Sequence, residues 1–188
     1  MWPRRRSVGA AAGTASGAGG AGESFEPGGD AQAPPLTIAQ LRARAIALLA
    51  RRDHSRAEME RKLARHSPDA GRVAQVLDQL QTEKLLSDQR FAEGVVRMRS
   101  ARYGSLRVAQ DLRARGVTGE MAGSLVSGLK ASEAERAREI WQRKFGSTPQ
   151  DGAERARQMR FLQARGFAPD VIRRVVPRAK AGAEDDTE

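Results

Sequence analysis

Apolar residues recur along the middle of the chain three or four positions apart, the spacing of amphipathic helices. Alternating patterns, β-branched runs and hairpin dipeptides, which are typical of strands, are nearly absent. Three capping boxes stand before apolar runs, at Thr37–Gln40, Ser55–Glu58 and Ser132–Glu135. The pattern predicts an all-α protein with nine helices, at 38–51, 55–65, 68–82, 88–101, 105–115, 119–129, 132–145, 149–165 and 169–176.

Prolines and glycines support these helix boundaries. Pro68 and Pro149 follow Ser67 and Thr148, so we expect each pair to form an N-cap and a first helical residue. Pro169 is expected to begin the last helix. Three glycines stand where helices should stop, at Gly116, Gly146 and Gly166.

The chain also repeats itself. "LRARGVTGEM" at 112–121 returns as "LQARGFAPDV" at 162–171, and Leu63 stands 49 residues before Leu112. Two apolar residues follow each of these leucines at the same distance, namely Val76 and Leu77, Leu125 and Val126, and Val175 and Val176. A period near 50 predicts three repeats of three helices, each leaning on its neighbour for stability.

The motif Leu-x-x-Arg-Gly-Val/Phe has a structural interpretation. Leu112 and Leu162 should face the core from the last turn of a helix, and the glycine after the arginine should adopt the left-handed conformation that ends it. Val117 and Phe167 can then fold back onto the core. In the first repeat His66, Ser67 and Pro68 replace Arg-Gly-Val, so its cap differs.

Composition sets the organisation of the whole chain. Residues 1–36 are rich in Gly, Ala and Ser, and 179–188 are acidic, so we expect both to be disordered tails. Between them we place the repeats at 37–86, 87–130 and 131–178. No run approaches a membrane span, Arg4–Arg6 lack the apolar segment of an export signal, and no cysteine is present, so we expect a cytoplasmic protein.

Catalytic chemistry has little support in the sequence. His54 and His66 are the two histidines, and we interpret them as caps or solvated residues, one in a turn and one at a helix end. Metalloprotease, nucleophile-elbow and phosphate-loop motifs are absent. We therefore expect no catalytic, cofactor or metal site.

Positive charge supports a binding function. The chain has 33 Lys and Arg against 23 acids, and the tails hold none of the excess. Such a field attracts polyanions or acidic protein surfaces, although an Arg-rich solvated face is the simpler alternative. The candidate binding residues are Arg52, Arg97, Arg99, Arg102, Tyr103, Arg107, Arg113 and Arg115. If the helix continues past Arg99, Arg99 and Arg102 share one face.

Three-helix units resemble helix-turn-helix DNA binders, but the third helices begin with acidic or bland residues, "PDAGRV", "GEMAGS" and "PDVIRR". Base readout requires donors and acceptors at that position. Arginines also bind phosphates and carboxylates equally well. The residues thus leave two hypotheses open, a protein-binding modulator and an autonomous nucleic-acid-binding protein.

Four segments in order resemble the RecX family, small bacterial regulators of the recombinase RecA: "LLARRDHSRAEMERKL" (48–63), "LLSDQRFAEGVVRMR" (85–99), "YGSLRVAQDLRARGV" (103–117) and "RFLQARGF" (160–167). The matching positions are Arg52, Ser55, Glu58, Leu63, Asp88, Arg90, Phe91, Ala92, Tyr103, Gly104, Arg107, Leu112, Gly116, Leu162, Arg165, Gly166 and Phe167. Ser105 stands where the family commonly has Pro and can still cap a helix. Arg65-His66 replaces the usual Lys-Gly.

The resemblance implies a curved array of three three-helix repeats without enzymatic activity. It implies binding in the groove of the RecA–DNA filament and limits on RecA ATP hydrolysis, strand exchange and stimulated repressor self-cleavage. Those activities belong to recombination, DNA repair and the SOS response. We expect a monomer, with direct contact to single- or double-stranded DNA as a further possibility.

Overall fold

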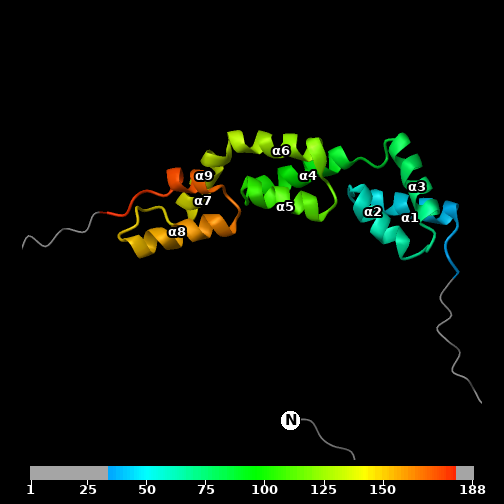
Figure 1. Ribbon diagram of the computed structural model, residues 1–188, viewed down its shortest axis with the longest axis horizontal. Coiled ribbons are helices and arrows are strands. Elements are labelled where there is room, and N and C mark those ends of the chain that lie inside the picture. The colour runs from blue at the N-terminus through cyan, green and yellow to red at the C-terminus, as the bar shows by residue number, and fades with distance from the viewer. Residues whose placement is uncertain (1–33, 181–188) are drawn as a thin grey trace, which may run out of the picture. The chain divides into compact units, whose positions relative to one another are not determined.

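A computed structural model describes residues 34–180, and the predicted tails lie almost entirely outside that range. In it every regular element is an α-helix (Figure 1). In chain order these are α1 (Ile38–Leu49), α2 (Arg56–Ala64), α3 (Ala70–Thr82), α4 (Asp88–Ser100), α5 (Ser105–Ala114), α6 (Gly119–Ala131), α7 (Glu133–Lys144), α8 (Gly152–Ala164) and α9 (Pro169–Val175). The all-α prediction and the nine helices are confirmed for this part of the chain.

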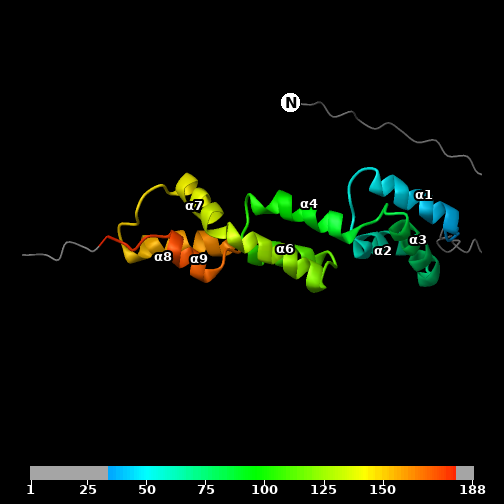
Figure 2. The same cartoon turned by 90° about the horizontal axis from the view of Figure 1, so that it is seen from above.

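The helices pack in three consecutive groups of three (Figure 2). We call α1–α3, α4–α6 and α7–α9 the first, second and third repeats. Each repeat has its own buried cluster of apolar side chains. The predicted frame is confirmed, because Leu63, Leu112 and Leu162 are all fully buried, one in each cluster. A leucine in the last turn of the second helix therefore anchors every repeat.

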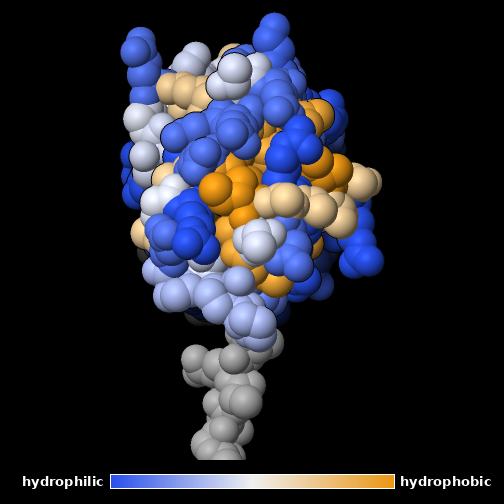
Figure 3. Space-filling model, turned by 90° about the vertical axis from the view of Figure 1, so that its right-hand side faces the viewer, coloured by the Kyte–Doolittle hydropathy of each residue, from blue (hydrophilic) through white to orange (hydrophobic). Residues whose placement is uncertain are grey.

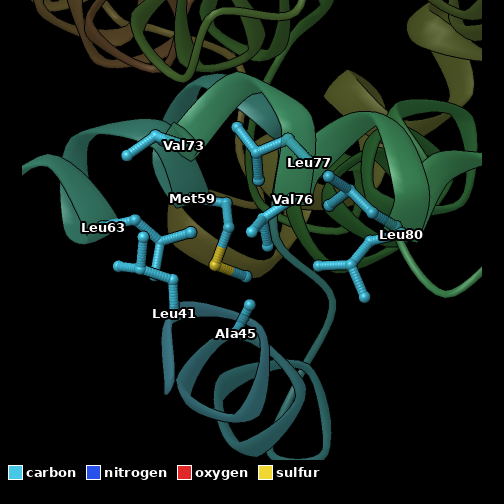
Figure 4. Packing of buried hydrophobic residues seen from close by; sticks show 9 residues of the cluster. Leu41, Ala45, Met59, Leu63, Val73, Val76, Leu77 and Leu80 are labelled. Carbon is cyan, nitrogen blue, oxygen red and sulfur yellow. The ribbon is translucent and has the colours of Figure 1, made fainter. Parts of the chain in front are cut away.

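The first repeat shows how this packing works (Figure 4). Leu41 and Ala45 of α1 face Met59 and Leu63 of α2, and α3 covers them with its apolar side. The α3 positions that do so are Val73, Val76, Leu77 and Leu80, the helical spacing seen in the sequence. From the side of this repeat, apolar atoms remain visible between hydrophilic ones (Figure 3).

The glycines that end the second helices behave as predicted. Gly116 and Gly166 have φ of +79° and +74°, a region that side chains with a Cβ rarely adopt. The residue after each glycine, Val117 or Phe167, is buried in the core of its repeat. Because the backbone N–H groups of these two residues donate to Leu112 and Leu162, the chain turns back onto the leucine that anchors the core.

Several predicted caps are wrong. Pro68 and Pro149 precede their helices, which are capped instead by Asp69 and Asp151, whose carboxylates accept N–H groups of the first turn. Ser132 makes no capping hydrogen bond, because it ends α6 and precedes α7 with no extended residue between them. Of the three capping boxes, only the one at Thr37 forms completely.

The first and second repeats meet at the N-terminus of α2. The Ser55 hydroxyl donates to the backbone oxygen of Arg115 at 2.6 Å. The Asp88 carboxylate accepts the backbone N–H of Arg56 at 2.7 Å. We call these contacts the first junction.

The second and third repeats meet in the same way at the N-terminus of α5. The Gly104 N–H donates to the backbone oxygen of Arg165 at 2.9 Å. The Glu133 carboxylate accepts the N–H and the hydroxyl of Ser105 at 2.9 and 2.8 Å. Ser105 was expected to cap α5; it is instead the first helical residue, and Gly104 precedes it. We call these contacts the second junction.

Candidate partner-binding surface

The eight candidate residues fall into groups with different surroundings. Arg52 and Arg115 lie beside the first junction, where both contact the carboxylate of Glu58, at 3.1 and 3.6 Å. His54 Nδ1 lies 3.1 Å from the same carboxylate. Glu58 therefore pairs with cations of two repeats, Arg52 of the first and Arg115 of the second, and offsets part of their positive charge.

His54 corrects one prediction. Its side chain is buried, 3% exposed, rather than solvated. Burial lowers the pKa of His54 below its usual 6.5, and the charge of Arg52 lowers it further, while Glu58 opposes both. His54 is thus held neutral, and its Nδ1–H can donate to Glu58.

Asp111 of α5 occupies a similar position in the second repeat. Arg99 of α4 lies 3.1 Å from its carboxylate and Arg107 lies 3.6 Å away. The Arg99 guanidinium also lies over the Tyr103 ring, 5.3 Å from its centroid. Arg99 therefore links α4, α5 and the turn between them.

The expected shared helical face of Arg99 and Arg102 is not formed. Helix α4 ends at Ser100, so Arg102 lies beyond it, in the connection to α5. Arg99 is half-buried, whereas Arg102 is exposed. The two side chains therefore have different surroundings although they are three residues apart.

Three of the candidates have no ion pair with a carboxylate in the described part of the chain. They are Arg97 in the last turn of α4, Arg102 after it, and Arg113 in the last turn of α5, and all three are exposed. Their guanidinium groups keep their hydrogen-bond donors for a partner. The pairing thus divides the candidate arginines into four with a carboxylate partner in the fold, of which Arg52 and Arg107 are still exposed, and three without such a partner.

Sequence reasoning missed the cations that the third repeat adds. Arg143 and Lys144 end α7, and Arg165 follows α8, and all three line one hollow together with Arg102 and Tyr103. The arginine at 165 was recognised as part of the repeat motif but not as a neighbour of Tyr103. The only sequence signal was local, two adjacent cations before the glycine at 146.

The backbone around this hollow is held by a half-buried arginine. The Arg136 guanidinium of α7 donates to the backbone oxygens of Ser100, Tyr103 and Leu129, at 2.7, 3.0 and 2.9 Å. Burial lowers the pKa of Arg136, and the nearby Glu133 opposes that effect. One side chain of the third repeat thus satisfies three carbonyl groups of the second.

The described residues give no support to a metal or membrane site. No group of three or more His, Cys, Asp or Glu side chains among them is placed to hold a metal ion. Within the same range, no helix is long and apolar enough to cross a bilayer.

Comparisons with known proteins agree with this architecture. Family models described as the first, second and third three-helix domains of RecX match residues 42–80, 87–123 and 131–176. The regulatory protein RecX of Ralstonia nicotianae is 44% identical over 154 residues, which cover 82% of this chain and 97% of the relative. That of Leptothrix cholodnii is 45% identical over 136 residues, covering 72% and 87%.

The crystal structure of RecX from Lactobacillus salivarius superimposes with a TM-score of 0.65 at 18% identity, covering 73% of this chain and 93% of that one. At that identity the likeness concerns the fold alone. The fold defines a tandem array of three-helix domains, and the family models identify each domain in order. The chain therefore belongs to the RecX family of regulatory proteins.

Proposed function

We propose that this protein binds the RecA nucleoprotein filament and limits RecA ATP hydrolysis, strand exchange and stimulated repressor self-cleavage. It acts in the cytoplasm as a monomer, in recombination, DNA repair and the SOS response, and catalyses no reaction itself. One observation carries the proposal: all three RecX domains match in their proper order, and one relative named as a regulatory protein is matched over 97% of its length.

The charge of the second repeat supports a direct contact with an acidic partner. Arg97, Arg102 and Arg113 present unpaired guanidinium groups, and such groups form bidentate bonds with carboxylates and phosphates. We assign the contact itself to these three and to the adjacent Tyr103. The other four candidates, Arg52, Arg99, Arg107 and Arg115, contribute through the donors that their carboxylate partners leave unused.

Co-sedimentation with RecA filaments, combined with the RecA ATPase rate, tests the proposal. The wild-type protein should pellet with filaments and slow ATP hydrolysis. The double variant Arg97→Glu, Arg113→Glu should lose both effects, because like charges at an interface cost several kcal/mol. The matched control is Arg44→Glu, Arg173→Glu, which changes two exposed arginines of the outer repeats with no ion pair to a described residue.

A wild-type protein that neither pellets with filaments nor slows ATP hydrolysis would refute the proposal. Equal loss in both double variants would show that net charge, rather than the second repeat, determines binding. The nucleic-acid hypothesis makes a separate prediction, binding to bare single-stranded DNA without RecA that weakens steeply as salt rises.

A further inference from the structure

A hollow beside the second junction gathers positive charge from the second and third repeats. Its volume is about 530 Å³, and four cations line it, Arg102, Arg143, Lys144 and Arg165. No acidic side chain lines it, and none of the four forms an ion pair with a described carboxylate. The hollow therefore suits an anionic group.

The contrast with the first junction strengthens this conclusion. There, Arg52 and Arg115 surround Glu58, which neutralises them from within the fold. At the second junction Arg107 stands at the position that matches Glu58, five residues before the anchoring leucine. Glu133, the counterpart of Asp88, is 1% exposed, is bound to Ser105 and does not line the hollow. Among the described residues, the second junction therefore lacks the internal carboxylate that the first one has, and its cations keep their donors for a group from outside the chain.

The aromatic rings decide which anion fits. The Arg165 guanidinium lies over the Phe161 ring at 3.7 Å, and Phe145 packs against that ring at an interplanar angle of 81°. The Tyr103 ring has Arg99 over it. Single-stranded nucleic acids bind by stacking bases on open aromatic faces. Tyr103 and Phe161, the two rings that line the hollow, each already have a guanidinium over one face, which leaves less ring surface for a base.

The rest of the lining is apolar. Ala101, Ile140 and Ala164 form a wall without hydrogen-bonding side chains. A nucleic-acid backbone presents polar sugars and phosphates to such a wall, whereas a peptide brings an apolar side chain next to its carboxylates. Stacking on Phe161 also presents the edge of the Arg165 guanidinium, the geometry that a planar carboxylate accepts in two hydrogen bonds.

We propose that this hollow binds an acidic segment of a protein partner, with its carboxylates on the four cations and an apolar side chain against Ala101, Ile140 and Ala164. The assignment rests on the proposed function, which supplies a protein partner. Beyond the proposed function, it names a binding site to which the third repeat contributes, and it states which chemical groups of the partner this site would bind.

The test uses the full-length protein and a fluorescein-labelled peptide of Asp and Glu residues around one central Phe, with binding followed by fluorescence anisotropy. The double variant Arg143→Gln, Lys144→Gln should bind this peptide at least about tenfold more weakly, equivalent to about 1.4 kcal/mol. The matched control is Arg138→Gln, Arg160→Gln, which removes two exposed cations of the third repeat, one from α7 and one from α8, that do not line the hollow. Circular dichroism should show that both variants keep their helicity.

Equal weakening in both double variants would overturn the site, since the general positive field would then explain binding. Failure of the wild-type protein to bind the peptide would also overturn it. The site would also be overturned if the wild-type protein binds a thymidine oligonucleotide, the Arg143→Gln, Lys144→Gln variant does not, and the peptide fails to displace the oligonucleotide. Filament co-sedimentation separates the two proposals: a protein that pellets with RecA but ignores the peptide refutes only the hollow. One that binds the peptide through Arg143 and Lys144 but ignores filaments refutes only the proposed function.

Discussion

The two junctions perform the same task with different chemistry. At each junction, the second helix of one repeat begins against two groups of the next repeat. One is the carboxylate of that repeat's first helical residue, and the other is the backbone oxygen of the arginine of its Arg-Gly turn. At the first junction the Ser55 hydroxyl reaches the Arg115 carbonyl, so a side chain makes the contact. At the second the backbone of Gly104 makes it directly to Arg165.

The difference shows how closely the backbones approach. A Cβ at position 104 would lie 2.3 Å from the Gly166 oxygen, so no side chain fits there. The acid is correspondingly more enclosed, because Glu133 is 1% exposed and also lies 3.4 Å from the Ala168 N–H.

Both junctions are closely packed, since a Cβ at Gly116 would lie 2.3 Å from the Ala57 Cβ at the first. At the second junction the two backbones bond to each other directly, whereas at the first the side chains of Ser55 and Asp88 make the bonds.

Removing the acids should give the largest effect. Glu133→Ala leaves the buried N–H and hydroxyl of Ser105 without an acceptor, and each unsatisfied group costs about 1–3 kcal/mol. Asp88→Ala removes one hydrogen bond at a more open site and should cost about 1 kcal/mol. Urea unfolding followed by circular dichroism gives both values, and equal losses would contradict the proposed difference between the junctions.

Adding a methyl group should have the next largest effect. Gly104→Ala forces the Gly166 and Phe167 backbone away and should destabilise by about 1–3 kcal/mol. Gly94→Ala in α4 is the matched control, because nothing lies within 4 Å of a Cβ there and alanine favours helix. Thermal melts of the two variants should move in opposite directions. A Gly104→Ala protein that melts like the wild type would show that the repeats approach less closely than described.

The smallest expected effect is a pH dependence confined to the first junction. Burial and Arg52 lower the pKa of His54, so the unfolded chain binds a proton more readily than the folded one. This contribution to stability is present above about pH 6.5 and is lost as the pH falls toward the lowered pKa of the folded state. His54→Gln should flatten the stability profile between pH 7 and 5, relative to the wild type, and an unchanged difference across that range would argue against a buried neutral His54.

The features that depend on only a few neighbouring residues were predicted correctly from the sequence. The leucine frame and the glycine turns depend on helical periodicity and on one left-handed residue, and both are visible in short segments. The cap at Ser132 failed because a capping box presupposes an extended chain before the helix, and α6 continues up to that residue. Asp69 caps α3 two residues after Ser67, and Asp151 caps α8 three residues after Thr148.

The proposed binding surface was less predictable because its members are distant in sequence. Tyr103 lines one hollow with Arg143 and Arg165 of the third repeat, and nothing near position 103 in the sequence indicates this arrangement. The same is true of Glu133, whose partner Ser105 lies 28 residues away. Charge density found Arg97, Arg102 and Arg113, but it could not distinguish them from Arg99 and Arg107, which Asp111 neutralises.

The helix boundary at Ser132 gives the two connections between repeats different tolerance to length changes. Residues 83–87 join the first two repeats through a turn in which Lys84 has φ +60°, so extra residues there can bulge outward. Ser132 alone separates α6 from α7. Each residue inserted there would rotate Glu133 by about 100° around the helix axis, since a helix has 3.6 residues per turn. The second connection therefore fixes the rotation of α7 relative to α6. A one-residue insertion at 132 should break the contact of Glu133 with Ser105, whereas the same insertion at 85 should leave the first junction in place.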